Sequence, residues 1–330
     1  MVSRIIKTTI IALTSVIVVF LLYLAYLAFF APKLKIVRVR EGLGNQLYMY
    51  ALAYSLKKEL ATTEPNSDVV VDLRHVKEKD KRSWVRNYFD DYNFDRVFQE
   101  YNVDPITRFA RKLVSKRVKD DYDSTGVRHD DVFNARGNLN ISVYGQSYLY
   151  FDKYRNDIIK IFKDVKGGLD KKNLQVIKQM QSYKNSVVVN VRLGDYLDKK
   201  NQNNLYLCKP EFYNEAIKEF EKLPDVHFFV FSDDINSAKT LLKFTKPHTY
   251  VDVNPLPQAH LNLILSSSAK HNLVSNSTFA WWAAYMNENK DKIIIAPKYW
   301  IRNKKGELVD TKKRQLFPKD FNVIYIDNLK

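Results

Sequence analysis

The sequence predicts an α/β protein of two halves, each built on a parallel sheet, preceded by one transmembrane helix. Three observations predict this fold. Apolar strands alternate with amphipathic helices through the second half of the chain, a shorter alternation opens the first half, and residues 8–31 carry no formal charge. Strands that alternate with helices indicate parallel sheets covered by helices on both faces.

Composition excludes several other classes of protein. Of the 330 residues, 45% are hydrophobic and only 9 are glycine, which rules out a disordered or collagen-like chain. Cys208 is the single cysteine, so a disulfide-stapled secreted domain is excluded as well. The net charge is +16, or +14 without Arg4 and Lys7. Such a charge suits an anionic substrate or anionic lipid, and no zinc-finger, RNP or helix-turn-helix signature indicates a nucleic-acid partner.

The segment Thr8–Ala31 predicts the membrane anchor. A helix of this length spans roughly 36 Å, enough to cross a hydrocarbon core of about 30 Å. A cleaved signal peptide would have a shorter apolar core. Arg4 and Lys7 precede the segment, and four basic residues follow it between Lys33 and Arg40. Counting those charges alone places the C-terminal bulk in the cytoplasm, although the later ones lie in an expected strand.

The first half is less regular than the second. We expect strands at Lys35–Arg40 and Val69–Leu73, and helices at Asn45–Ala61, Ile106–Val118 and Asp152–Asp164. In the second half, strands are expected at Ser186–Arg192, Val226–Phe231, Thr249–Val253, Asn272–Ser275 and Lys292–Ala296, the last closing the series, with helices at Lys209–Lys222, from Asp234, at His260–Lys270 and at Ser277–Asn287. The residues between, near 165–185, are interpreted as a linker or long surface loop.

Ligands of open α/β sheets bind beyond the carboxyl ends of the strands, and two such ends carry glycine. The first is residues 41–46, EGLGNQ, which follow a strand and open a helix. Gly42 and Gly44 allow close approach of a ligand, Asn45 can reach it, and a helix N-terminus favours an anion. The alternative is an ordinary capped turn. The second is Arg192, Gly194 and Asp195, where the arginine fork suits a diphosphate. The alternative is a structural ion pair between Arg192 and Asp195.

Two further strand ends carry hydroxyl, amide and carboxylate groups. Ser232 and Asp233 follow the strand of residues 226–231 and can hold a ribose, a base or a sugar, or simply cap a helix. Asn276, Ser277 and Thr278 precede an aromatic helix start, where free N–H groups suit a phosphate. Asn276 and Asn140 both begin glycosylation sequons, and Asn140 is the expected acceptor because Asn276 should be sheltered.

Taken together in this order, the four segments resemble the α-1,2-fucosyltransferases of glycosyltransferase family 11. The family's G-G-L-G-N-Q-[ML]-F-x-Y-A is matched by GLGNQLYMYA at 42–51, and its H-[VI]-R-R-G-D-Y by NVRLGDY at 190–196. Its F-S-D-D is present at 231–234, and its N-S-S-F-S-W-W is matched by NSTFAWW at 276–282. The resemblance covers residues 36–300, nearly the whole chain after the anchor.

This resemblance implies a GT-B fold of two Rossmann-like halves, a GDP-fucose donor, inversion at the fucose anomeric carbon and no metal. With the predicted membrane segment, the expected organisation is a short tail at 1–7, an anchor at 8–31, an acceptor-side half at 32–165 and a GDP-sugar half at 166–330. Arg192 would contact the diphosphate, and Asp195 is our candidate base. Gly42, Gly44, Asn45, Gly194, Ser232, Asp233, Asn276, Ser277 and Thr278 would complete the donor site. A galactose-terminated glycan is the expected acceptor.

Three departures from the family pattern bear on activity. Asn190 replaces the family histidine, Leu193 replaces its second arginine, and Glu41 replaces its first glycine. The alternative function is therefore a membrane-tethered glycan-binding relative with impaired catalysis. A metal-dependent transferase using Asp121 and Asp123 is a weaker rival, because no apolar strand precedes that pair. For the compartment, a type II Golgi protein with a luminal catalytic part is expected, and a bacterial inner-membrane enzyme facing the cytoplasm is the alternative.

Overall fold

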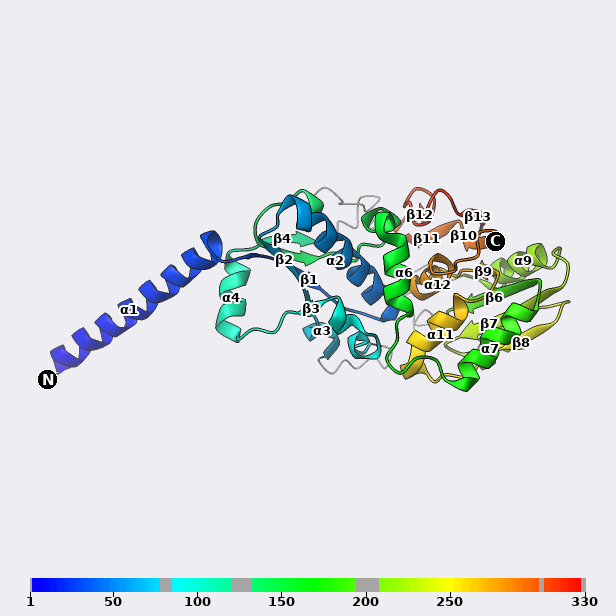
Figure 1. Cartoon of the computed structure of the whole chain (residues 1–330), viewed down its shortest axis with the longest axis horizontal. Coiled ribbons are helices and arrows are strands. Elements are labelled where there is room, and N and C mark those ends of the chain that lie inside the picture. The colour runs from blue at the N-terminus through cyan, green and yellow to red at the C-terminus, as the bar shows by residue number, and fades with distance from the viewer. Residues whose placement is uncertain (1, 78–84, 120–131, 194–207, 303–305, 328–330) are drawn as a thin grey trace.

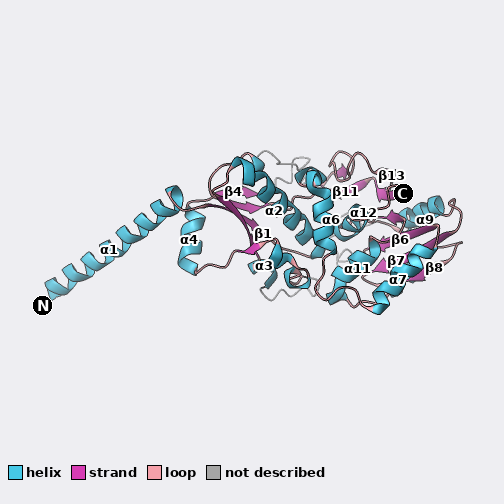
Figure 2. Cartoon of the chain, in the orientation of Figure 1, coloured by secondary structure: helices cyan, strands magenta, loops and turns pink. Residues whose placement is uncertain are grey.

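A computed structural model describes residues 2–77, 85–119, 132–193, 208–302 and 306–327. Helix α1 (Val2–Phe29) extends away from a body that consists of two α/β halves in succession (Figure 1). Each half contains a sheet whose strands all pair in parallel, with helices packed over it (Figure 2). The predicted fold class is confirmed: this is a GT-B-like arrangement with one N-terminal apolar helix.

The N-terminal half is built on a five-stranded sheet of order β3-β2-β1-β5-β4. Its strands are β1 (Lys33–Arg38), β2 (Ser67–Asp72), β3 (Gln99–Glu100), β4 (Lys116–Lys119) and β5 (Leu139–Ser142). The helices are α2 (Leu43–Thr63), α3 (Arg74–Lys77), α4 (Pro105–Leu113) and α6 (Arg155–Lys163), with 3-10 turns at Phe89–Asp91, Phe94–Arg96, Tyr148–Tyr150 and Asp152–Tyr154.

The C-terminal half is built on a six-stranded sheet of order β13-β10-β9-β6-β7-β8. Its strands are β6 (Asn185–Val191), β7 (Val226–Ser232), β8 (His248–Tyr250), β9 (His271–Leu273), β10 (Ile293–Pro297) and β13 (Asn322–Ile326). The helices are α7 (Lys171–Ser182), α9 (Pro210–Phe220), α10 (Ile235–Leu241), α11 (Ala259–Ser266) and α12 (Thr278–Tyr285), with a 3-10 turn at Leu256–Gln258. Strands β11 (Tyr299–Arg302) and β12 (Leu308–Asp310) form a separate antiparallel pair.

Three expectations about elements were wrong. The expected linker near 165–185 contains helix α7, whose N-terminus is capped by Asp170 accepting a hydrogen bond from the Asn173 N–H at 2.9 Å. The helix expected over 106–118 ends at Leu113, because the next residues form β4 against β5. The strand series does not close at Ala296, since β13 pairs with β10.

Helix α1 is joined to the body by packing as well as by the chain. It is the single helix among the described residues that is long and apolar enough to cross a membrane. Most of it is exposed, but Leu27 is buried against Ala110 of α4, together with Ala31 just after the helix. The Asn138 side-chain amide donates to the Leu27 carbonyl at 3.3 Å, and the Lys33 ammonium donates to the Ala28 carbonyl at 2.5 Å. The C-terminal turns of α1 are therefore part of the folded domain.

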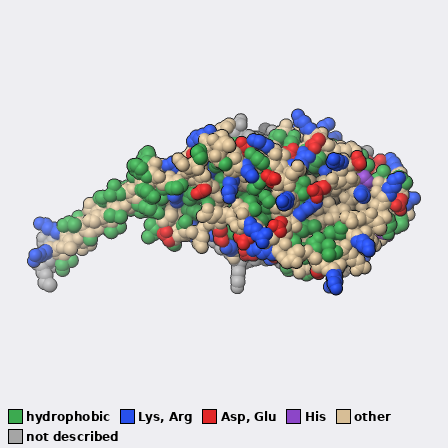
Figure 3. Space-filling model, viewed as in Figure 1, with side chains coloured by type: hydrophobic (Ala, Val, Ile, Leu, Met, Phe, Trp, Pro, Cys, Tyr) green, Lys and Arg blue, Asp and Glu red, His purple; other side chains and the backbone are tan. Residues whose placement is uncertain are grey.

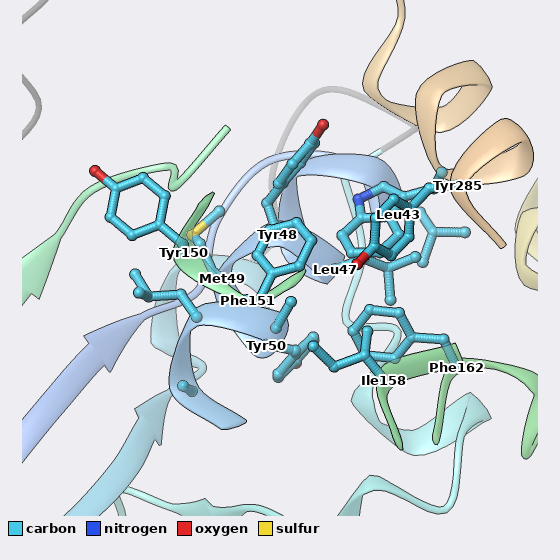
Figure 4. Close-up of a cluster of buried hydrophobic side chains, with 14 of the residues drawn as sticks. Leu43, Leu47, Tyr48, Met49, Tyr50, Tyr150, Phe151, Ile158, Phe162 and Tyr285 are labelled. Carbon is cyan, nitrogen blue, oxygen red and sulfur yellow. The ribbon is translucent and has the colours of Figure 1, made fainter. Parts of the chain in front are cut away.

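An aromatic cluster fixes the two halves to each other. Helix α2 of the first half packs on α12 of the second, and their rings interlock with Phe151. The Tyr48 ring lies 4.7 Å from Trp281, and Phe151 stacks on Trp282 at 5.4 Å. Figure 4 shows Tyr48, Phe151 and Tyr285 converging in this cluster. We call it the aromatic junction; burial of such large rings stabilises one relative placement of the halves.

Candidate active site

A cleft of about 800 Å³ opens beside the aromatic junction, between the two halves. Its lining combines the carboxyl ends of strands β6 and β7 with the first turns of α2 and α12. All nine predicted donor-site residues that the structure describes line it: Gly42, Gly44, Asn45, Arg192, Ser232, Asp233, Asn276, Ser277 and Thr278. Segments separated by more than 200 residues in the sequence thus share one cavity, of a size typical of small-molecule sites.

Two helix N-termini converge on this cleft. Helix α2 begins after Gly42 and helix α12 after Ser277, and neither has a side-chain cap. The first N–H groups of a helix have no partner within it, and they carry part of the helix dipole's positive charge. Two such ends facing one cavity favour a ligand with more than one negative charge.

Arg192 supplies a side-chain cation at the same place. It follows β6 and forms an ion pair with Asp233, whose Oδ2 lies 2.9 Å from Nη1 of Arg192. Asp233 also accepts a hydrogen bond from the Leu193 N–H at 2.9 Å. These contacts orient the guanidinium, which remains 22% exposed toward the cleft. The structural alternative, an ion pair of Arg192 with Asp195, falls outside the described residues, whereas the ion pair with Asp233 is a different one.

Ser232 and Asp234 are occupied by local structure. The Ser232 hydroxyl donates to the Asp234 carbonyl at 3.0 Å and accepts from the Asp234 N–H at 3.0 Å. Asp234 in turn caps α10 by accepting from the Ser237 N–H. Ser232 lies in the cleft wall. Because its hydroxyl already donates and accepts within this turn, only its remaining acceptor capacity is available to a ligand.

The segment before α12 is sheltered, as expected for Asn276. That side chain is 3% exposed, and it accepts from the Cys208 thiol and donates to the Trp300 carbonyl, both at 3.4 Å. Ser277 is 9% exposed. On the facing side, the Asn45 side chain accepts from the Gln146 amide at 2.9 Å. Both asparagines are thus held in place by their neighbours.

Gly44 has a packing role that the sequence interpretation did not foresee. A Cβ at this position would lie 2.5 Å from both the Phe279 backbone nitrogen and the Thr278 Oγ1. The Gly44 carbonyl accepts a hydrogen bond from the Trp282 indole N–H at 2.9 Å. Only a glycine lets α2 and α12 approach this closely. The group that approaches Gly44 closely is therefore helix α12 of the same chain, whereas the sequence predicts a ligand there.

The three departures from the family pattern have distinct surroundings. Asn190 lines the cleft at 4% exposure, and no hydrogen-bond partner is found for its side-chain nitrogen among the described residues. Leu193 is 3% exposed and packs in the core cluster of the C-terminal half. Glu41 has a φ of +66°, a left-handed conformation that favours glycine. The backbone conformation at this position therefore explains why the family has glycine there.

Several cleft residues were not predicted. Asp252 follows β8 and places an exposed carboxylate in the lining. The strand expected at Thr249–Val253 extends past this residue, so the strand-end rule does not select it. Tyr88 lies in the opposite wall, where burial raises the pKa of its hydroxyl to about 12, so it remains a neutral hydrogen-bonding group. Tyr144, Gln146, Asn254 and Trp300 also line the cleft. Tyr144, Gln146 and Asn254 come from irregular segments and Trp300 from β11, so the strand-end rule does not reach these positions.

Other predicted residues lie elsewhere or outside the described part. Gly194, Asp195 and the rival pair Asp121 and Asp123 lie outside the described residues. Asn140 lies in β5, between β1 and β4, and its side-chain oxygen is buried. A central strand is a poor location for a glycan acceptor. Within the described ranges, no three His, Cys, Asp or Glu side chains gather as a metal site would require.

The two parallel sheets, with a cleft between them that gathers Arg192 and two helix N-termini, define a glycosyltransferase of the GT-B type. Residues 36–321 match the model of Glycosyl transferase family 11, and the chain belongs to that family. The predicted family is confirmed.

Two curated relatives from Escherichia coli are similar over most of their length. An alpha-1,2-colitosyltransferase is 28% identical over 281 residues, which cover 81% of this chain and 92% of the relative. The O-antigen biosynthesis glycosyltransferase WbnK is 23% identical over 296 residues, covering 81% and 95%.

Solved structures show a more distant similarity. NodZ α-1,6-fucosyltransferase soaked with GDP-fucose is 16% identical, with 77% of this chain and 92% of that chain covered at a TM-score of 0.40. A FUT1 variant of Arabidopsis thaliana in complex with GDP is 13% identical, with 79% and 70% covered at a TM-score of 0.46.

Proposed function

We propose that the chain transfers L-fucose from GDP-fucose to a hydroxyl of a galactose-terminated glycan, with an α-1,2 linkage and inversion at the anomeric carbon. The observation that carries the proposal is the convergence of Arg192 with the N-termini of α2 and α12 on one cleft. Membership of family 11 and the family motifs support the donor and the linkage.

The proposed chemistry follows from where charge develops. As the C–O bond between sugar and phosphate breaks, negative charge grows on the departing GDP, and positive charge grows at the anomeric carbon. Arg192 and the first-turn N–H groups of α2 and α12 would stabilise the departing diphosphate, because they are fixed before the reaction begins. The chain's own residues supply this stabilisation in our proposal, and no metal is required.

Inversion requires one base to remove the proton from the attacking glycan hydroxyl. We assign this role to Asp195, which follows Arg192 by three residues. Glu41 and Asp252, whose carboxylates line the cleft, are the comparison groups for testing that assignment, because Asp233 is occupied by Arg192.

A second donor has a specific observation in its favour. The 28% identical relative is named a colitosyltransferase. Colitose is the 3-deoxy form of L-fucose, so one site could accept both sugars unless it binds the 3-hydroxyl.

A GDP-release assay of the full chain distinguishes these possibilities. GDP-fucose, GDP-colitose, GDP-mannose and UDP-galactose are compared with and without galactose-terminated acceptors, and the product linkage is read by NMR. We expect acceptor-dependent release from GDP-fucose and an α-1,2 product. Preferred release from GDP-colitose would assign the second donor. Tight GDP-fucose binding with no release from any donor would support the alternative of an impaired glycan-binding protein.

We also propose that α1 is a retained membrane anchor with the catalytic part on the cytoplasmic face. Leu27 and Ala31 are buried in the folded body, which supports retention over cleavage. Both curated relatives are bacterial, which supports the inner-membrane alternative over the Golgi arrangement. Protease added to right-side-out and inverted vesicles tests it: degradation only in inverted vesicles is expected. Glycosidase-sensitive modification at Asn140 in a eukaryotic host would instead favour a luminal catalytic part.

A further inference from the structure

Helix α4 exposes an apolar face that its own domain does not cover. Ile106 is 66% exposed, Phe109 is 54% exposed and Leu113 is 54% exposed. Spacings of three and four residues place all three side chains on one face of the helix. Beyond α1 and Phe30, the other exposed large hydrophobic side chains among the described residues are single ones on separate elements: Leu149, Leu174, Leu256 and Ile324. A contiguous exposed face of this kind marks an interaction surface.

The same helix packs along the C-terminal part of α1. The Phe109 ring stacks on Phe20 at 6.3 Å, and the Tyr23 hydroxyl lies 2.8 Å from the Thr107 hydroxyl. Leu27 and Ala110 are buried where the two helices meet. Figure 1 shows α4 beside the end of α1 where it joins the body, and Figure 3 shows hydrophobic side chains gathered in that region.

This contact fixes the depth of α4 relative to a bilayer. Phe20 precedes the end of α1 at Phe29 by nine residues, or about 14 Å along the helix. If α1 spans a hydrocarbon core of about 30 Å, Phe20 lies inside one leaflet. Phe109, which stacks on it, then lies at or below the headgroups of that leaflet.

The charges around α4 suit anionic headgroups. Residues 105–119 contain six Lys or Arg and no Asp or Glu. Lys112, Lys116 and Arg117 are exposed. Arg111 is instead buried and donates to the Pro32 carbonyl and to Asn138 Oδ1, both at 3.1 Å, which fixes α4 to the start of β1. An apolar face bordered by basic side chains is typical of a helix that lies in the membrane interface.

We propose that α4 is a second membrane contact, inserted into the interface of an anionic leaflet with Ile106, Phe109 and Leu113 toward the acyl chains. The proposal rests on the anchoring proposed for α1. Two contacts of different type would fix the tilt of the catalytic body on the membrane, because a single helix leaves the body free to swing. The cleft would then stand at a constant height above the lipid surface.

Spin labels on the full chain in vesicles test this depth directly. The vesicles contain phosphatidylethanolamine and phosphatidylglycerol, and labels are placed one at a time through Ile106→Cys and Leu113→Cys. Val16→Cys in α1 is the bilayer reference, and Leu174→Cys on α7 is the matched exposed leucine of the body. The unmutated chain is the blank, because burial raises the pKa of the Cys208 thiol to about 12 and makes it unreactive.

Collisions with oxygen and with a water-soluble nickel chelate report depth. We expect labels at 106 and 113 to be oxygen-accessible and nickel-shielded, as at 16, while the label at 174 is nickel-accessible. Water-like values at 106 and 113 with bilayer-like values at 16 would overturn the inference and leave the anchor intact. Shielding from both reagents would mean a protein partner, which also overturns it. Water-like values at 16 would instead refute the proposed anchor.

The lipid charge is tested by Lys116→Glu combined with Arg117→Glu in the Leu113→Cys chain. We expect a severalfold rise in nickel accessibility at 113, with none at 16. An unchanged value at 113 would overturn the role assigned to anionic lipid.

Discussion

The cleft and the aromatic junction are adjacent parts of the same contact between the halves, yet they are built in opposite ways. The junction is apolar and filled by Tyr48, Phe151, Trp281 and Trp282. The cleft holds an ion pair, two uncapped helix N-termini and the buried side-chain nitrogen of Asn190. Helices α2 and α12 contribute their first turns to the cleft and their next turns to the junction.

Residues of the family motifs therefore have two different roles: some line the cleft, and others pack the two halves together. Gly44 and Trp282 belong to two different family segments, and they bind each other across the halves. Arg192 belongs to a third, and its guanidinium lies in the cleft wall. We therefore expect cleft substitutions to change rate with little change in stability, and junction substitutions to lower stability first.

The largest expected effect is that of Asp195→Asn. Loss of a general base should lower kcat by about 10²–10⁴-fold and abolish the acidic limb of the pH–rate profile. Stopped assays of transfer across pH measure this. Asp252→Asn is the matched control and should retain that limb. If Asp252→Asn lost it and Asp195→Asn did not, the base would be Asp252.

Arg192→Ala should lower kcat by about 10²–10³-fold, because one preorganised donor to the leaving diphosphate is lost. Arg192→Lys keeps the charge without the fork and should recover part of the rate. The melting temperature should fall little, since Asp233 keeps its hydrogen bond from Leu193. A rate within a few-fold of the parent would contradict the assignment of the diphosphate to Arg192.

Gly44→Ala should destabilise the chain by about 1–3 kcal/mol, because the new methyl group meets backbone atoms of α12 that cannot move alone. Activity should fall with stability, since the first turn of α2 lines the cleft. Chemical denaturation and the transfer assay measure the two effects. Gly167→Ala, where nothing lies within 4 Å, is the control: its φ of +79° adds strain, but the rate should not change.

Tyr50→Phe should make the free energy of unfolding decrease less steeply at high pH. Burial raises the pKa of Tyr50 well above its usual value, so the folded chain keeps this proton while the unfolded chain releases it above about pH 10. Stability is therefore complete below pH 10 and declines above it. Removing the hydroxyl, for which no partner is found in the described part of the chain, should reduce the decline by at most about 1.4 kcal/mol per pH unit. An unchanged decline would refute this origin.

The smallest expected effect is that of Glu41→Gly. Relief of the left-handed strain is worth about 1–2 kcal/mol, and the added freedom of glycine in the unfolded chain offsets about 0.5–1 kcal/mol of it. A net gain of roughly 0.5–1 kcal/mol should raise the melting temperature. Glu41→Ala removes the carboxylate but keeps the strain, and it should give no such gain. Equal gains from both variants would assign the effect to charge.

Much of the site could be predicted because the carboxyl ends of parallel strands meet at one edge. That rule predicts that Arg192, Asp233 and Asn276 lie together, and all three line the cleft. The packing of Gly44 against α12 could not be predicted, because the two helices are more than 200 residues apart in the sequence and their spacing is a property of the folded chain. Helix α7 could not be predicted, because its polar composition is also typical of a linker and its cap, Asp170, is a weak signal in the sequence.

The aromatic residues also show that the sequence pattern does not specify which residues pack together. Trp281 and Trp282 lie in an apolar segment, and both are fully buried. Their contact with Tyr48 and Phe151 is a property of the pair of halves, and neither half shows it alone. Apolar pattern predicts burial but does not specify the partner.

The most direct test of the account is the structure of the full chain with GDP bound. We predict that the diphosphate lies between the first turns of α2 and α12, with its oxygens within hydrogen-bond distance of the Arg192 guanidinium and of backbone N–H groups from both helices. A diphosphate bound elsewhere, or held in the cleft without Arg192 and either helix end, would contradict it.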